Sequence, residues 1–160
     1  QIVQPLLLEL HRAKSTDEIV RLLSVVANTA STTAIPLIAR YASDSSSSIR
    51  ASAMSSLLLM DQPVADQLLR THLLTDPEFV VRMAAASVLI RRRMTSENFA
   101  ALRSAFDTEQ SERLRLLLLA GIWGAREEYP QATSVVRQAA EFDTQEKIKN
   151  EAIRLIEEME

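Results

Sequence analysis

The chain has 160 residues, of which 47% are hydrophobic and 24% charged, and its formal net charge is −3. This composition is typical of a folded protein, and the small negative charge gives no general reason to expect a nucleic-acid partner. Because cysteine is absent, disulfides, thiolate zinc sites and cysteine nucleophiles are excluded. Two glycines and five prolines are too few for a β-rich chain, so the expected fold class is all-α.

The first helix is expected over residues 2–14, with Pro5 in its opening turn, where a missing N–H costs little. Ser15 and Glu18 have capping-box spacing and begin a second helix that runs to about Asn28. We interpret residues 1–30 as a degenerate N-terminal hairpin. The chain begins with Gln1 and no signal peptide, so its start is expected to be processed or truncated. The compartment stays open, with the cytoplasm slightly favoured.

From residue 33 the predicted helices recur as pairs. They cover 34–42 and 49–60, 63–74 and 79–92, 96–106 and 111–124, and 130–141 and 146–159. Each pair is a helical hairpin of about 32 to 34 residues, a period typical of helical solenoids. An acid is expected in the turn of every pair, at Asp44, Asp76, Asp107 and Asp143.

The second helix of every pair begins with the same arrangement of side chains. A base follows an apolar residue, then a small residue comes three positions later and a large apolar one four further on. The bases are Arg50, Arg82, Arg115 and Lys149. The best-formed copy runs from Thr75 to Arg93, TDPEFVVRMAAASVLIRRR, where Thr75 or Asp76 can accept from the first free amides of the helix.

This pattern resembles the HEAT-repeat family, whose units are helix pairs with an Asp in the turn and V-R-x-x-A at the start of the second helix. Asp76, Val81, Arg82 and Ala85 fit it closely, whereas the third unit has two extra residues in its turn. The resemblance implies a right-handed α-α superhelix of about ten helices, forming a single α-solenoid domain over residues 1–160 that is part of a longer chain. It also implies an Asp–Arg ladder between adjacent turns, linking Asp44, Asp76 and Asp107 to Arg50, Arg82 and Arg115.

Three adjacent second helices carry small and apolar residues on the side opposite their packed face. In the resembled family the second helices line the concave surface. Our hypothesis is an apolar concave strip that binds a protein or peptide, including another domain of the same chain. The alternative is that curvature or a neighbouring segment buries these side chains. The strip consists of Leu58, Met83, Ile90, Leu116 and Trp123.

Arg91, Arg92 and Arg93 are candidates for contact with an anionic partner, although a helix end attracts cations anyway through its dipole. Neither of the two histidines, His11 and His72, has a metal-ligand spacing, and no phosphate-binding glycine loop is present. His72 precedes Asp76 by four residues and is expected to contact it at the helix end. We therefore predict no catalytic residue, metal or cofactor, and a non-catalytic scaffold or interaction module.

Two other functions stay open at this point. A lipid- or hydrophobic-ligand-associated helical domain is one, because VANTASTTAIPLIARY followed by SIRASAMSSLLL is similar to helical repeats of large lipid-transfer proteins. A nucleic-acid-binding HEAT-like array is the other, and it is disfavoured because it needs a basic concave face. No apolar run approaches the roughly 20 residues of a membrane span, so no transmembrane segment is predicted.

Overall fold

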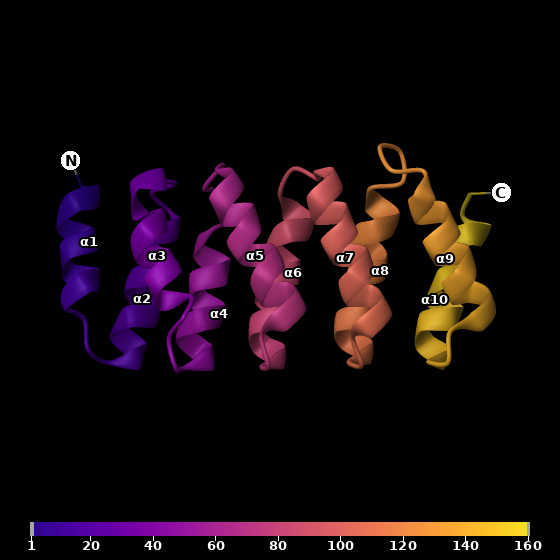
Figure 1. The fold of residues 1–160 in the computed structure, drawn as a ribbon, viewed down its shortest axis with the longest axis horizontal. Coiled ribbons are helices and arrows are strands. Elements are labelled where there is room, and N and C mark those ends of the chain that lie inside the picture. Colours follow the sequence, from indigo (N-terminus) through magenta and orange to yellow (C-terminus); the bar gives the residue numbers. More distant parts are fainter. Residues whose placement is uncertain (1, 160) are drawn as a thin grey trace. The chain divides into compact units, whose positions relative to one another are not determined.

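The computed structural model describes residues 2–159, and within them the secondary structure is entirely helical (Figure 1). The helices follow one another as the repeat pattern predicts, with boundaries within a few residues of those expected. They are α1 (Val3–Arg12), α2 (Thr16–Ala27), the 3-10 helix η1 (Thr32–Ala34), α3 (Ile35–Tyr41), α4 (Ser47–Ser56), α5 (Pro63–Thr75), α6 (Phe79–Arg91), α7 (Ser96–Thr108), α8 (Glu112–Gly124), α9 (Gln131–Phe142) and α10 (Glu146–Glu157). The all-α class and the helical-solenoid architecture are confirmed.

The helices belong to two compact units, of which the first ends at Arg92 and the second begins at Arg93. In unit 1, the hairpins α1–α2, α3–α4 and α5–α6 stack so that α4 packs against both α2 and α6. In unit 2, α7 pairs with α8 and α9 with α10, and α8 packs against both α9 and α10. The single domain expected over residues 1–160 stays a prediction.

The packed side of the second helices forms the core of each unit. Ala53, Ala85 and Ala152, the predicted small positions, are completely buried, and small side chains there allow neighbouring helices to approach closely. The large positions Leu57 and Leu89 are also completely buried. Burial of each fully covered aliphatic side chain contributes about 1.5 to 3 kcal/mol, so this repeated seam is the main source of stability.

Arg50 joins two successive turns of unit 1. Its guanidinium donates two hydrogen bonds of 2.9 Å to the carboxylate of Asp76 and a third, of 3.0 Å, to the backbone oxygen of Asp44. Asp76 also accepts from the amide of Glu78 and contacts Nδ1 of His72, both at 3.0 Å. Burial alone raises the Asp76 pKa, but the bonds from Arg50, Glu78 and His72 outweigh it and hold the pKa well below its usual range.

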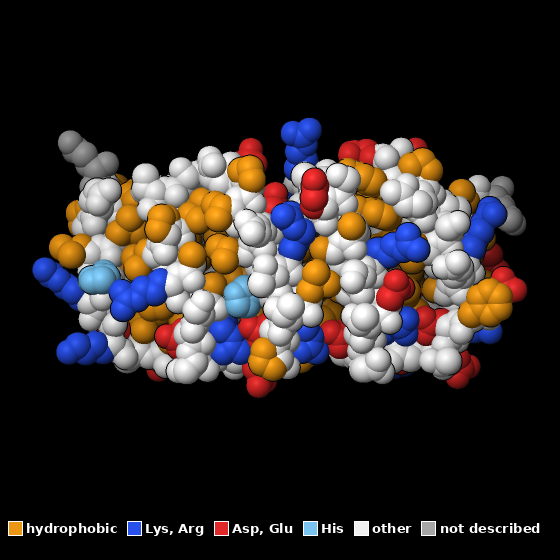
Figure 2. All heavy atoms as spheres, viewed as in Figure 1, with side chains coloured by type: hydrophobic (Ala, Val, Ile, Leu, Met, Phe, Trp, Pro, Cys, Tyr) orange, Lys and Arg blue, Asp and Glu red, His pale blue; other side chains and the backbone are white. Residues whose placement is uncertain are grey.

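The same arrangement recurs in unit 2 between Arg115 and Asp143. Arg115 donates to the two carboxylate oxygens of Asp143 at 2.9 and 2.6 Å. Asp143 also accepts from the amide of Gln145, and together these bonds lower its pKa despite the opposing effect of burial. In each unit, blue and red side chains lie next to one another along the turn edge at the bottom of Figure 2. The expected ladder therefore pairs an arginine with the aspartate of the following hairpin.

The turn acid of the third repeat is Glu109, so the prediction of Asp107 was wrong. Asp107 lies inside α7 and is exposed, whereas Glu109 is the residue at which α7 ends. One carboxylate oxygen of Glu109 accepts from the amides of Gln110 and Ser111, as Asp76 and Asp143 do from their own turns. With Glu109 in this place the two extra residues of the third turn disappear, because Glu109 precedes Arg115 by the same interval that separates Asp76 from Arg82.

Candidate partner-binding surface

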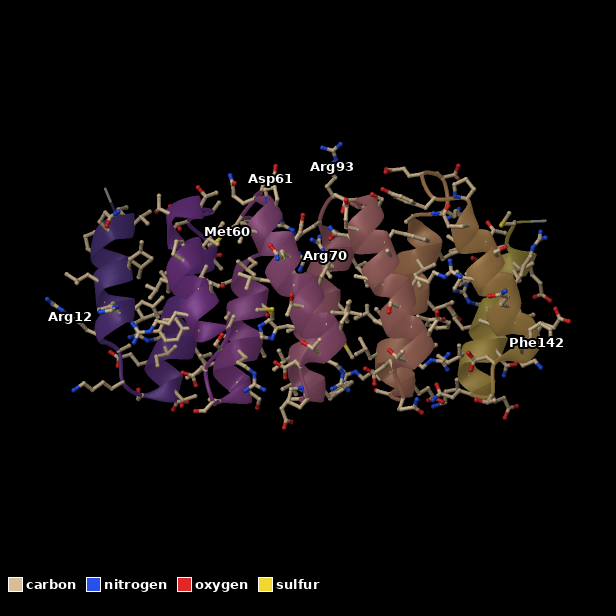
Figure 3. All side chains as sticks on the ribbon, viewed as in Figure 1. Arg12, Met60, Asp61, Arg70, Arg93 and Phe142 are labelled. Atoms are coloured by element: carbon tan, nitrogen blue, oxygen red, sulfur yellow. The ribbon has the colours of Figure 1, made fainter. Side chains whose placement is uncertain are left out.

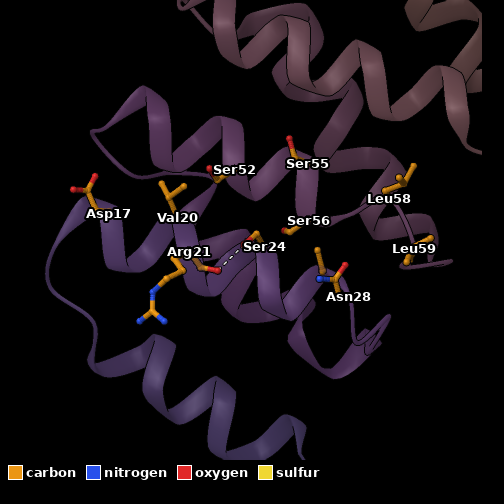
Figure 4. A pocket seen from close by; sticks show the side chains of 11 residues that line it. Asp17, Val20, Arg21, Ser24, Asn28, Ser52, Ser55, Ser56, Leu58 and Leu59 are labelled. Atoms are coloured by element: carbon orange, nitrogen blue, oxygen red, sulfur yellow. Dashed lines mark hydrogen bonds between the residues drawn. The ribbon is translucent and has the colours of Figure 1, made fainter.

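A groove with a volume of about 540 Å³ runs along the second helices of unit 1, between α2 and α4 (Figure 4). Asp17 and Arg21 lie at one end of the groove, and Leu58 and Leu59 lie at the other. Most of the remaining lining residues are small or polar, so few bulky side chains project into the groove. They are Val20, Ser24, Ala27, Asn28, Ser52, Ser55 and Ser56.

The residues that α2 contributes to the groove are spaced three or four positions apart, so they lie on one face of the helix. Residues at 17, 20, 21, 24, 27 and 28 fall on one face of α2, while Ile19, Leu23 and Val26 face the core. This face was not among the predicted sites, because residues 1–30 were interpreted as a degenerate hairpin. The signal was nevertheless present, since Ser24 and Asn28 are polar positions one turn apart on the side opposite the apolar stripe.

Serine hydroxyls place hydrogen-bond acceptors along the groove. Ser24 donates its hydroxyl proton to the backbone oxygen of Arg21 at 2.7 Å, and Ser55 donates to that of Ala51 at 3.1 Å. A hydroxyl has one proton and two lone pairs, so the oxygens of Ser24 and Ser55 remain able to accept. Both side chains are exposed. The groove therefore offers hydrogen-bond acceptors between a charged end at Asp17 and Arg21 and an apolar end at Leu58 and Leu59.

The predicted concave strip is divided between the two units. In unit 1, Leu58 is half-buried and lines the groove, and Met83 and Ile90 are half-buried residues of α6. In unit 2, Leu116 of α8 is half-buried, but Trp123 is only 8% exposed. The guanidinium carbon of Arg126 lies 4.7 Å from the centroid of the Trp123 ring. The expected exposure of Trp123 was wrong, because its own chain covers the indole.

The three consecutive arginines do not form one cationic cluster. Arg92 donates to the Asp66 carboxylate at 2.6 Å and to the backbone oxygens of Leu57 and Met60 at 2.7 and 3.0 Å. These carbonyls follow the end of α4, where helix carbonyls have no intrahelical partner. Arg92 is therefore a buried helix cap, and its assignment to an anionic partner was wrong. Arg91 and Arg93 are exposed, and Figure 3 shows Arg93 pointing away from the helices.

Unit 2 has a smaller groove on its first-helix side, with a volume of about 390 Å³. Phe99 and Tyr129 stack there with ring centroids 4.8 Å apart, and exposed Arg103 and Asp107 line the rim. The Tyr129 hydroxyl donates to the backbone oxygen of Met94 at 3.5 Å. This groove was not predicted from the sequence, because Phe99 and Tyr129 are 30 residues apart along the chain.

Within residues 2–159, no group of three or more His, Cys, Asp or Glu side chains is placed to hold a metal ion. No helix in this part of the chain is long and apolar enough to cross a membrane. The contact between His72 and Asp76 belongs to the turn described above and confirms the helix-end interaction that was expected.

Comparison with known proteins gives one match. The family model described as HEAT repeats matches residues 3–90, which is more than half of the chain. No curated protein matches the chain. No solved structure matches it either.

Proposed function

Because the chain belongs to the HEAT-repeat family, we propose that it is a non-catalytic protein-interaction module that receives a peptide segment of a partner in the α2–α4 groove. HEAT repeats generally mediate protein interaction or scaffolding. The observation that carries the proposal is the open groove on the second-helix side of unit 1, where Leu58 of the predicted strip is one of the lining residues.

The lining favours a peptide over the alternative ligands. An acyl chain gains from continuous apolar walls, whereas here serine hydroxyls, Asn28 and two charged residues interrupt the apolar surface. Nucleic acid would need an excess of positive charge, and Asp17 balances Arg21 in this groove. A peptide backbone supplies N–H donors for the acceptors of Ser24 and Ser55, and an aliphatic side chain fits against Leu58 and Leu59.

Met83 and Ile90 extend the proposed surface along α6. Counted from the base of each repeat, they occupy the positions of Ala51 in α4 and of Leu58, which follows α4; seven residues apart in α6, they fall on the same side of that helix. We propose that a longer partner segment reaches them. Leu116 of unit 2 stays a separate candidate contact.

The proposal can be tested by selecting binding peptides from a displayed library against the immobilised 160-residue protein. The selected peptide is then titrated against Leu59→Glu and Ser55→Trp. Leu59 is 56% exposed and Ser55 is exposed, so these changes alter the groove with little cost to folding. We expect at least a tenfold loss of affinity for each, because one places a charge against an apolar side chain and the other fills the groove.

Matched controls separate the groove from other surfaces. Val64→Glu on α5 and Ser134→Trp on α9 introduce the same side chains at exposed positions outside the groove. Both are expected to bind the peptide as the unaltered protein does. A selected peptide whose affinity is unchanged by Leu59→Glu and Ser55→Trp would overturn the proposal. Preferential binding of lipid vesicles in the same assay would favour the lipid-associated alternative instead.

A further inference from the structure

The two ends of the α2–α4 groove differ in chemistry. Asp17 and Arg21 lie at one end, whereas half-buried Leu58 and exposed Leu59 lie at the other (Figure 4). The lining between them consists mainly of serine, alanine and asparagine side chains. A segment that occupies the whole groove therefore meets charge at one end and an aliphatic pair at the other.

The Asp17 carboxylate is the charge that a partner meets at its end of the groove. Asp17 is exposed, and no hydrogen bond or ion pair to its carboxylate is present within residues 2–159. Arg21 also lines the groove, but its guanidinium points toward the α1 side and away from α4 in Figure 4. The neighbouring charges of Lys14 and Glu18 are not part of the lining. An unpaired carboxylate is complemented by a cation, whereas a second carboxylate is repelled there.

The acceptors along the groove favour an extended backbone. Ser24 of α2 and Ser55 of α4 lie on opposite walls, and each keeps an acceptor lone pair. The N–H groups of an extended segment are free and point alternately to its two sides, so they reach both walls. A helical segment uses its N–H groups internally and leaves these acceptors unfilled.

The length of the groove sets the spacing of the matching side chains. Along α2 the lining extends from Asp17 to Asn28, eleven residues later, and Asn28 lies on the side of Leu58 and Leu59 in Figure 4. At 1.5 Å per residue this length is about 16 Å. An extended segment advances about 3.3 Å per residue and covers it in about five residues. Because alternate side chains point to the same side, two that both face the groove are about four or six residues apart.

Building on the proposed function, which places a peptide in this groove, we propose that the peptide is an extended segment with a defined pair of side chains. A lysine or arginine of the peptide pairs with Asp17, and a leucine, isoleucine or valine packs against Leu58 and Leu59. The pair is about four or six positions apart, and the backbone between them donates to Ser24 and Ser55. The partner of this groove is therefore a basic, extended segment and not a helix or an acidic tail.

Selection on two forms of the protein tests the pairing. A displayed library of short random peptides is selected against the 160-residue protein and, separately, against its Asp17→Lys variant. We expect peptides from the original protein to share a base about four or six positions from an aliphatic residue. Peptides from the variant should carry Asp or Glu in place of that base and keep the aliphatic residue, because Leu58 and Leu59 are unchanged.

Titration of one selected peptide measures the contribution of the charged end. Asp17→Asn is expected to lower its affinity about threefold, because an exposed ion pair is weak, and Asp17→Lys about tenfold. Asp17 is exposed, so both variants are expected to keep the fold, which circular dichroism checks. Replacing the peptide's base by Glu should restore binding to Asp17→Lys. Glu9→Lys, the same change of charge on an exposed residue of α1 outside the groove, is the control and should leave the affinity unchanged.

The outcomes separate this inference from the proposed function. Peptides that lose affinity with Ser55→Trp but bind Asp17→Lys as well as the original protein would overturn the pairing and leave the groove as the binding site. Enrichment of acidic residues on the original protein would overturn the pairing as well. Recovery of no peptide, or of peptides indifferent to Ser55→Trp, would overturn both proposals.

Discussion

Arg50 and Asp76 connect two successive hairpins of unit 1 through two hydrogen bonds of 2.9 Å between side chains that are 12% and 3% exposed. A buried charge is tolerated only while it is paired, so removal of one partner leaves the other without compensation. The pair also orders the turn itself, because Asp76 accepts from the amide of Glu78. This contact therefore makes the stability of one hairpin depend on the next.

Replacing Asp76 by alanine is expected to lower the free energy of unfolding by about 3 to 5 kcal/mol, the usual cost of breaking a buried ion pair. Urea denaturation followed by circular dichroism measures the change. Asp61→Ala is the matched control, because Asp61 is an exposed aspartate of the same unit, and its effect is expected to stay within about 0.5 kcal/mol. Equal effects of the two changes would contradict a structural role for the Arg50–Asp76 pair.

Acid is expected to destabilise the protein through the same carboxylates. The pKa values of Asp76 and Asp143 are lower in the folded protein than the usual aspartate value of about 3.9. A carboxylate with a lowered folded pKa contributes stability that is fully present above its unfolded pKa and is lost as pH falls toward the folded pKa. Thermal midpoints measured between pH 7 and pH 2 should therefore decrease below about pH 4.

Asp76→Asn provides the control for the acid effect, because the amide has a similar shape and does not titrate. Its midpoint should be lower than that of the original protein at pH 7 and should change less between pH 5 and pH 2. Parallel pH curves for the two proteins would exclude Asp76 as a source of the acid dependence.

Arg92→Ala is expected to cost about 3 kcal/mol, whereas Arg91→Ala should be close to neutral. Arg92 pairs with the part-buried Asp66 carboxylate and donates to the backbone oxygens of Leu57 and Met60, so its truncation removes the charge partner of Asp66 and one donor from each carbonyl. Arg91 is exposed. Guanidinium denaturation of the two variants distinguishes them, and a larger loss for Arg91→Ala would contradict the assignment of Arg92 as the cap.

Glu109→Ala is expected to lower stability by about 1 kcal/mol, the typical net value of a hydrogen bond, because Glu109 accepts from the amides of Gln110 and Ser111 in the turn before α8. Asp107→Ala should change it by less than about 0.5 kcal/mol, since Asp107 is exposed within α7. Thermal unfolding of both variants compares the two positions. The opposite ranking would restore Asp107 as the turn acid.

Gly124→Ala is expected to stabilise the protein by about 0.5 to 1 kcal/mol. Gly124 is the last residue of α8, and a Cβ added there meets no heavy atom within 4 Å. Alanine loses less backbone entropy than glycine when it enters a helix. Differential scanning calorimetry measures the gain, and a destabilised variant would contradict the open space beside this residue.

Local features of the fold could be predicted well from the sequence. The capping-box spacing of Ser15 and Glu18 corresponds to a hydrogen bond of 3.3 Å from the Glu18 amide to Ser15 Oγ. Hydrophobic period and turn residues located the helices to within a few residues, because capping and amphipathicity act over a single turn of chain. The error at Asp107 arose because two acids lay near the turn and only the end of α7 distinguishes them.

The candidate surfaces depended on packing that sequence patterns do not contain. Trp123 and Ile90 have the same register position, yet Trp123 is buried beneath Arg126 of its own unit, whereas Ile90 is half-buried. Likewise, three adjacent arginines read alike in the sequence, and only the approach of α4 and Asp66 makes Arg92 a buried cap.

The sequence by itself determined the helical repeat, its period and the residues that form the packed seam, since these follow from interactions a few residues apart. The family resemblance implied a ladder between adjacent turns, and the tertiary structure decided that the aspartate paired with Arg50 is Asp76 and that α2 and α4 leave a groove between them. The physical reason is that partners about 30 residues apart are chosen by how whole helices stack.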